Sequence, residues 1–252
     1  RESQEKVIPA LTKDVAAEKR FKPSLYTQFQ YRDSNERGAQ DAFAGQHSFQ
    51  LRRVRFGGTY QIDPTTSVKA SFEGTANHGS SGGRSVELKD AILRWDFRPG
   101  TSLMAGQLAL PLGFELMRSS SDREMPERMT GNRRIFDGER FRGAYVTHGL
   151  GDGFSAWGGV VGSLTVNDPE QRTMNVSRFG RHAAAAGVRY VGSGVDAGLA
   201  FFGGQRPSTT GQPNSPSVDR RFWFFDFSYS GLVDGLVFRS EAWLGQDRLP
   251  SS

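Results

Sequence analysis

The chain has 252 residues, 36% of them hydrophobic and 12% aromatic, which is too apolar a composition for an intrinsically disordered protein. Thirty-one glycines and nineteen phenylalanines stand beside only five methionines, and this balance favours strands and turns over helices. No apolar run approaches the length of about eighteen residues that a transmembrane helix needs. The formal charge of +5 is compatible with anionic partners without requiring them.

Charged residues dominate the start of the chain. We expect residues 1–23 to be a leader or linker, and residues 24–252 to form the folded domain. In that domain, apolar and polar side chains alternate in about eleven segments bounded by turn residues, which is the period-two pattern of β-strands. The predicted strands cover residues 24–32, 48–62, 66–76, 86–97, 102–110, 139–148, 154–164, 182–191, 195–204, 220–230 and 235–245.

The connections between these strands alternate between long and short. The long ones are polar and cover residues 33–47, 77–85, 111–138, 165–181 and 205–219, and a tight turn follows the next strand each time. One edge of the sheet would then carry long loops and the other edge tight turns, as in outer-membrane barrels. The sequence therefore predicts an all-β fold, namely an antiparallel up-and-down transmembrane β-barrel in the bacterial outer membrane.

Alternation within the strands supports the same prediction. From Val68 to Glu73, even positions are apolar and odd positions are polar or charged. A membrane barrel turns its apolar face to lipid and its polar face to a water-filled lumen. Aromatic residues, Phe141 and Tyr145 among them, gather toward strand ends, where they would form the interfacial girdles of a barrel.

The stretch SFQLRRVRFGGTY, residues 48–60, mixes arginines with large apolar side chains. Its apolar side chains occupy odd positions up to Leu51 and even positions from Val54, so the pattern slips by one residue near Arg52 and Arg53. Such a slip predicts a β-bulge. An arginine at mid-depth on the lipid face would cost about 2–4 kcal/mol, so we expect Arg53 and Arg55 to point into the lumen.

The same alternation places cations of other strands on the lumenal face. Guanidinium groups bind phosphate and carboxylate groups well, and cations lining a pore attract anions. The alternative is that these cations pair with neighbouring carboxylates and line a wet channel without selecting ions. The predicted anion path consists of Arg52, Arg53, Arg55, Lys69, Arg94, Arg142, Arg189 and Arg239.

Signatures of catalysis are scarce. The four histidines show no metal-ligand spacing, and there is no glycine-rich phosphate loop. Asp90 and Asp96 could be read as an acid and a base, but at this spacing they fit lumen-lining charges better. Basic and aromatic residues alternate across strands instead of forming one patch, which argues against nucleic-acid binding. We expect no enzymatic activity, no metal and no cofactor.

Three segments carry a resemblance to a known family: FQLRRVRFGGTY, ELKDAILRWDFRPGTSLMAGQLALPLGFE and SSSDREMPERM. Over about residues 21–150, the chain resembles the phosphate- and polyphosphate-selective porins of the porin O/P family. In this resemblance, Arg52 and Arg53 match an Arg-Arg pair, and Asp90 matches an acidic strand position. The family's phosphate-site lysines have no clear match, because the chain has no lysine after Lys89.

The resemblance implies a homotrimer of sixteen-stranded barrels. It also implies that loop 111–138 bends into the lumen as a constriction, with arginines forming an anion path. Outer-membrane lipid and lipopolysaccharide would surround such a barrel, and small anionic solutes would be its other partners. The constriction-loop residues are Glu115, Arg118, Arg123 and Arg128.

Eleven strands is an odd number, whereas single-chain bacterial barrels have even numbers, so we expect further C-terminal strands outside this sequence. The predicted function is passive diffusion of small hydrophilic anions, with phosphate as a candidate, through an arginine-lined lumen. Two alternatives stay open. One is a structural or plugged outer-membrane barrel that anchors a larger assembly, and the other is a soluble all-β module that binds acidic glycans.

Overall fold

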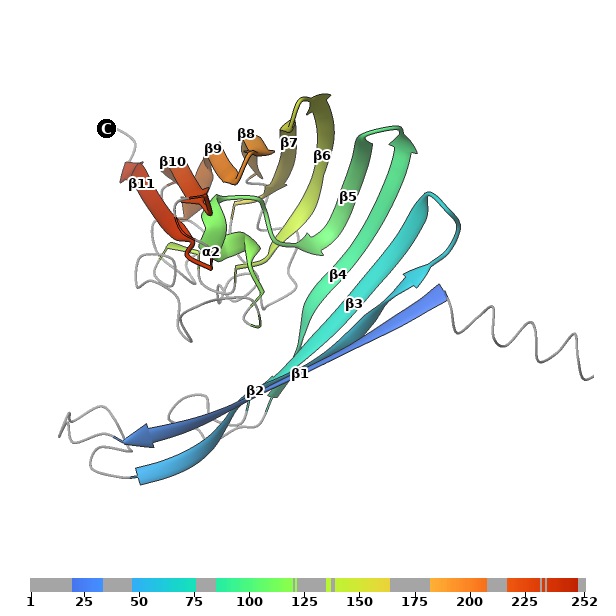
Figure 1. Cartoon of the computed structure of the whole chain (residues 1–252), viewed down its shortest axis with the longest axis vertical. Coiled ribbons are helices and arrows are strands. Elements are labelled where there is room, and N and C mark those ends of the chain that lie inside the picture. The colour runs from blue at the N-terminus through green and yellow to red at the C-terminus, as the bar shows by residue number, and fades with distance from the viewer. Residues whose placement is uncertain are drawn as a thin grey trace, which may run out of the picture. The chain divides into compact units, whose positions relative to one another are not determined.

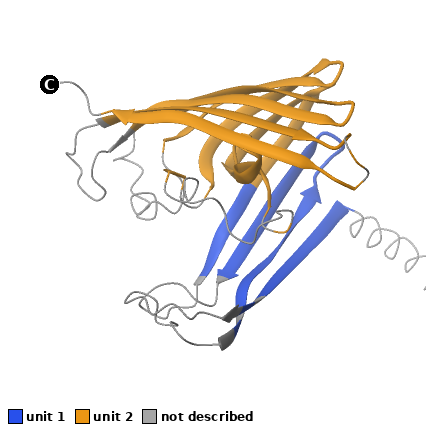
Figure 2. Cartoon of the chain, turned by 60° about the vertical axis from the view of Figure 1, so that its left-hand side comes forward, with its two compact units in different colours: residues 1–91 blue, residues 92–252 orange. Residues whose placement is uncertain are grey.

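The computed structural model describes residues 20–33, 47–75, 85–119, 121, 135–136, 139–163, 182–207, 217–231, 233 and 235–248. The chain divides into two compact units, residues 1–91 and 92–252, which Figure 2 shows in different colours. In the described parts, no helix is long and apolar enough to cross a membrane. The predicted leader 1–23 lies mostly outside the described residues, and β1 begins at Phe21.

Among the described residues, eleven strands follow one another in a sheet whose strand order is the chain order (Figure 1). This arrangement confirms the predicted all-β fold, and each predicted strand overlaps one observed strand. A short helix, α2 (Gly113–Met117), follows β5. The strands are β1 (Phe21–Asp33), β2 (His47–Gln61), β3 (Thr66–Thr75), β4 (Ser85–Arg98), β5 (Thr101–Leu108), β6 (Phe141–Gly151), β7 (Phe154–Gly162), β8 (His182–Gly192), β9 (Val195–Pro207), β10 (Ser217–Tyr229) and β11 (Phe238–Arg248).

The register of β1 and β2 in the first unit confirms the predicted bulge. Gln28 lies opposite Arg53, and the next residue, Phe29, lies opposite Leu51, so Arg52 is the extra residue of β2. The insertion brings the odd-numbered apolar residues before it and the even-numbered ones after it onto the same face of the strand. The opposite face of β2 is left to polar and charged side chains.

In each unit, the apolar face of the strands is the exposed one. Leu25 in the first unit is 76% exposed and Trp223 in the second is 46% exposed, whereas Asp90 and Asp226 on the opposite faces are only 3% and 6% exposed. A soluble sheet shows the reverse polarity. Exposed apolar surface on this scale requires lipid or a partner to cover it. We call the side that carries the charged residues the inner face.

The core of the second unit lies on this inner face. The sequence predicted a charged, wet wall here, and that prediction was wrong for much of the unit. The apolar side chains are buried because segment 108–117 and residues 135–136 pack onto the strands. The cluster includes Leu108, Leu110, Leu112, Leu116, Phe136, Phe141, Tyr145, Phe202, Phe222 and Phe224.

Asp63 closes the tight turn between β2 and β3. Its Oδ1 atom accepts hydrogen bonds from the Thr65 hydroxyl (2.7 Å) and from the backbone N–H groups of Thr65 (2.8 Å) and Thr66 (2.9 Å). These bonds, with the Thr65 hydroxyl contributing most, lower the pKa of Asp63. The turn therefore gains stability from the ionised carboxylate.

Asp63→Ala should lower the melting temperature of the protein in detergent at neutral pH and have little effect in strong acid. A carboxyl group whose folded pKa is depressed contributes stability above its unfolded pKa, and this stability is lost as the pH falls through the folded pKa. Melting curves near pH 7 and near pH 2 measure the difference. Asp63→Asn is the matched control, since it keeps an acceptor without the charge. A deficit of equal size at both pH values would contradict the prediction.

Candidate functional site

Two arginines of β2 share one carboxylate of β3 on the inner face of the first unit. Arg55 lies directly opposite Glu73 in the register. It donates to Oε2 of Glu73 through Nε, at 3.0 Å, and through Nη2. Nε of Arg53 lies 3.2 Å from Oε1 of the same carboxylate. The Lys89 ammonium also acts electrostatically on Glu73, so this group of side chains carries a net positive charge.

Asp90, the acidic position matched by the resemblance, is buried on the same face of the first unit. The Ser71 hydroxyl donates to its Oδ2 at 2.7 Å, and Nζ of Lys69 lies 3.2 Å from that oxygen. The Lys69 side chain is 46% exposed, whereas the Asp90 side chain is only 4% exposed. Lys69 therefore compensates a buried carboxylate while its own side chain keeps contact with water.

Arg94 of β4 is the first charged residue on the inner face of the second unit. Its Nη2 lies 2.9 Å from Oδ1 of Asp96 and donates to the Ser102 hydroxyl at 3.0 Å. Both charged side chains are more than 40% exposed. The pair is locally neutral, and solvent screening makes its contribution to stability small.

Glu241 of β11 fixes helix α2 to the strands. Its Oε2 atom accepts hydrogen bonds from the backbone N–H groups of Phe114 (2.8 Å) and Glu115 (3.0 Å), and its Oε1 accepts one from the Trp243 indole (2.6 Å). Gly113 has a φ of 69°, and a Cβ atom there would lie 2.4 Å from Oε1 of Glu241. Glycine is therefore required at the position where the chain turns into the helix.

Phe136 fixes a second part of the same loop. Its side chain is fully buried, and Arg220 lies over its ring at 5.5 Å from the centroid. Arg220 also donates to the backbone carbonyl of Ile135 at 3.3 Å and pairs with Asp247 at 3.2 Å. The aromatic rings within 6.2 Å of the Phe136 centroid are Phe141, Phe202, Phe222, Phe224 and Trp243.

The predicted constriction loop 111–138 is thus held to the inner face of the second unit at two described points, α2 and Phe136. Glu115 contributes to this attachment through its backbone N–H, which donates to Glu241, and the Arg118 guanidinium lies 5.5 Å from the ring centroid of Phe114. Arg123 and Arg128 lie outside the described residues. The described parts of the loop are packed by contacts, as a fixed constriction requires.

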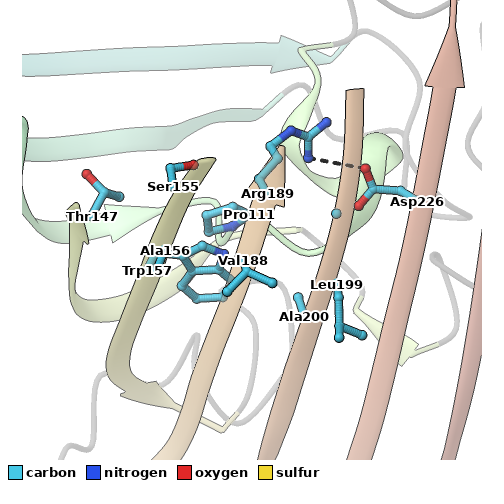
Figure 3. Close-up of a pocket in the computed structure, with 11 residues that line it drawn as sticks. Pro111, Thr147, Ser155, Ala156, Trp157, Val188, Arg189, Leu199, Ala200 and Asp226 are labelled. Carbon is cyan, nitrogen blue, oxygen red and sulfur yellow. Dashed lines mark ion pairs between the residues drawn. The ribbon is translucent and has the colours of Figure 1, made fainter. Parts of the chain in front are cut away.

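Arg189 of β8 lies between two carboxylates, and Figure 3 shows its ion pair with one of them, Asp226. Its Nε is 2.6 Å from Asp196 and its Nη1 is 3.2 Å from Asp226, and its guanidinium lies 5.0 Å from the ring centroid of Phe114. The two carboxylates outnumber the one guanidinium. The charge of Arg189 is therefore compensated at this position of the predicted anion path.

A small cavity adjoins this ion pair. Its volume is about 130 Å³, which is room for a few water molecules. Trp157 and Pro111 supply apolar walls, and Ser155 supplies a hydroxyl beside the Arg189–Asp226 pair (Figure 3). The cavity is too small to form a passage by itself. Among the described residues, no cluster of His, Cys, Asp or Glu could hold a metal ion.

Arg142 lies on the face opposite to the predicted one. Phe141 and Tyr145 belong to the buried core, and Arg142 alternates with them along β6 on the side of the exposed Val146. The alternation pattern put Arg142 on the wrong face because Phe141 and Tyr145 were expected to face lipid. Instead, these two aromatic residues pack inside against the loop. Nε of Arg142 donates to Oε1 of Gln107 at 3.3 Å.

Two further predicted cations have defined places. Arg239 shares the inner face of β11 with Glu241, and the charge of Arg118 acts on it. Arg52 is the bulge residue of β2. The structure therefore brings Arg53 and Arg55 together, and also Arg118 and Arg239, but leaves Arg94 and Arg189 in separate ion pairs.

Sequence reasoning missed Phe136, Arg220 and Asp226. The sequence pattern could have placed Asp226 on the inner face, because it lies between the exposed Phe225 and Phe227 in β10. Arg220 has the same parity in that strand. No sequence pattern could have identified Phe136, since it lies in a loop without periodicity and its ring partners come from five different positions of the chain.

Comparisons with known proteins agree with this geometry. A family model described as phosphate-selective porin O and P matches residues 24–209. No curated protein sequence matches the chain. Among solved structures, the chain is similar to OmpT, an outer membrane protein of Vibrio cholerae folded in vitro, with a TM-score of 0.51 and 8% identity. This match covers 92% of the present chain and 65% of that chain, and at this identity it shows the fold alone.

Proposed function

Because the chain belongs to the phosphate-selective porin O and P family and is a β-barrel protein of the bacterial outer membrane, we propose that it forms a pore for passive diffusion of small hydrophilic anions. Phosphate is among the solutes we propose, and a homotrimer is the proposed assembly. The family and the outer-membrane location exclude the alternative of a soluble module for acidic glycans.

One observation carries the anion preference. Arg53 and Arg55 share the single carboxylate of Glu73, and all three side chains are about 12–13% exposed on the polar face of their strands. Guanidinium groups stay ionised and replace part of the hydration shell of an anion. Their excess positive charge would raise the local anion concentration in a lumen bounded by this face.

Other predicted path residues contribute less to this preference. Lys69 and Arg94 each compensate a carboxylate, and Arg189 is outnumbered by two. Wet channel walls of mixed sign attract ions of both signs, so selectivity lies at β2 and not along a continuous row of arginines. This is a narrower site than the sequence predicted.

The double variant Arg53→Gln with Arg55→Gln should lose anion preference. A unit charge about 4 Å from an ion in water is worth about 1 kcal/mol, so we expect a decrease of about fivefold in the ratio of anion to cation permeability. The reversal potential across a KCl gradient in a planar bilayer measures this ratio. Arg142→Gln is the matched control, because it removes an arginine from the opposite face. An unchanged reversal potential in the double variant would refute the role of this pair.

Phosphate is tested in the same recordings. If phosphate enters the site, adding it to a chloride solution should reduce the chloride current of the parent protein more than that of the double variant. Equal inhibition of both would place any phosphate site elsewhere in the chain.

A plugged or structural barrel is the second candidate, and the apolar cluster around Phe136 favours it. These side chains occupy inner-face positions that an open, wet lumen would leave to polar residues. A plugged barrel gives no steady conductance. Bilayer recording of the parent protein therefore separates the two functions.

A further inference from the structure

Three arginines of the second unit lie on the outer face, opposite the core. They are Arg142 in β6, Arg221 in β10 and Arg248 in β11, and all three side chains are exposed. Arg221 lies between the buried Arg220 and Phe222, so its side chain is on the opposite face of β10. Arg248 lies opposite Asp219, which has the same parity as Arg221. We call these three side chains the outer arginines.

Arg142 and Arg221 lie near the starts of strands that follow long connections, and Arg248 lies opposite Asp219, beside the start of β10. A stretch of about ten residues, the length of a transmembrane strand, separates Arg142 from the tight turn at Asp152. A similar stretch separates Arg221 from the β10–β11 connection at Ser230, and Arg248 is the last residue of β11. If the turns lie at one membrane surface, the three guanidiniums lie at the other.

The turn ends of the same face carry aromatic residues instead. Phe154 and Tyr190 pack with ring centroids 4.8 Å apart, and Phe227 and Phe238 with centroids 6.4 Å apart. Aromatic rings of this kind mark a membrane interface. The two edges of the apolar outer face therefore differ in charge: aromatic pairs lie at the turn edge, whereas at the other edge the guanidiniums lie next to the aromatic pair Phe201–Trp223.

Neutral amides hold two of the outer arginines in place. Arg142 donates to Gln107 at 3.3 Å, and Arg248 donates to Gln246 at 2.8 Å. Gln246 also lies directly opposite Arg221 in the register, so it stands between two guanidiniums. Amide oxygens orient a guanidinium without neutralising it. Asp219, the carboxylate of this edge, accepts a hydrogen bond from Gln205 at 2.9 Å.

We propose that the outer arginines bind the phosphate groups of lipid headgroups in the external leaflet of the outer membrane. Long loops of such barrels face the outside and tight turns face the periplasm, which puts these side chains at the external headgroup level. Guanidinium forks match phosphate oxygens in geometry and charge. The site rests on the outer-membrane location of the protein and is independent of the selectivity proposed for its pore.

The test compares the parent protein, folded in detergent micelles, with the variant carrying Arg142→Gln, Arg221→Gln and Arg248→Gln. The probe is lipid A with two phosphates, and native mass spectrometry measures the bound fraction over a titration. We expect the affinity of the triple variant to fall by about tenfold or more, as for the loss of at least one charge-assisted hydrogen bond. His148→Gln, on the same face of β6 near the tight turn, is the matched control and should bind like the parent.

Two further arms identify the chemistry. Lipid A without phosphates, with the same acyl chains, should bind parent and triple variant equally, which also shows that the variant is folded. Inorganic pyrophosphate at the same concentration should not displace the lipid, because the site includes the adjoining apolar face. Equal affinity of parent and triple variant for the phosphorylated lipid would overturn the proposal, and so would displacement by pyrophosphate. The reversal potential of the triple variant should match the parent, so failure here and failure of the anion path are distinguishable.

Discussion

Phe136→Ala should release the end of loop 111–138 and destabilise its packing by about 3–5 kcal/mol. The ring is fully buried among five other aromatic rings, so its removal leaves a cavity and also ends several edge-to-face contacts. Limited proteolysis of the protein in detergent measures the release, through the rate of cleavage within residues 111–138. Single-channel records should show a noisier and larger conductance.

The matched control for this variant is Phe201→Ala. Phe201 packs against Trp223 on the outer face, with ring centroids 4.8 Å apart, and does not belong to the buried cluster. It should change the stability without changing loop cleavage. If the loop of Phe136→Ala resists protease as well as the parent, then Arg220 and α2 are sufficient to anchor it.

Glu241→Ala should detach helix α2 at a cost of about 3 kcal/mol, because two backbone N–H groups and one indole N–H lose a charged acceptor. Hydrogen exchange followed by mass spectrometry should show faster exchange at Phe114 and Glu115. Glu241→Gln should have a smaller effect, since an amide oxygen still accepts hydrogen bonds.

A variant in α2 itself provides an independent test of the contact between α2 and Glu241. Gly113→Ala places a Cβ atom against the carboxylate of Glu241 and forces a left-handed backbone on a residue that disfavours it. It should accelerate exchange in α2 as Glu241→Ala does. Slow exchange in both variants would mean that α2 is held by the apolar cluster and not by Glu241.

Much of the fold could be predicted from the sequence, because lipid on one side and water on the other impose a strict period of two. The bulge at Arg52 was visible for the same reason, since a single extra residue changes the parity of everything after it. The Arg53–Arg55 position on the inner face followed from that parity. These are local patterns, and they need no knowledge of distant residues.

The rest depends on contacts between distant segments. Phe141 and Tyr145 carry the same chemistry whether they face lipid or a packed loop, so parity alone could not choose, and Arg142 was assigned to the wrong face with them. Helix α2 is only five residues long and is fixed by Glu241, more than a hundred residues later in the chain. No local sequence pattern predicts a contact between residues so far apart in the chain.

The extra residue in β2 has a consequence for how this strand can change in evolution. The bulge absorbs Arg52 without altering which way its neighbours face, so deleting Arg52 would yield a regular strand with Leu51 and Val54 still on the same side. Loss of Leu51 or Val54 would also remove the bulge, but it would put Arg52 or Arg53 in the vacated position on the apolar face. Shortening of β2 by one residue is therefore tolerated best at this arginine.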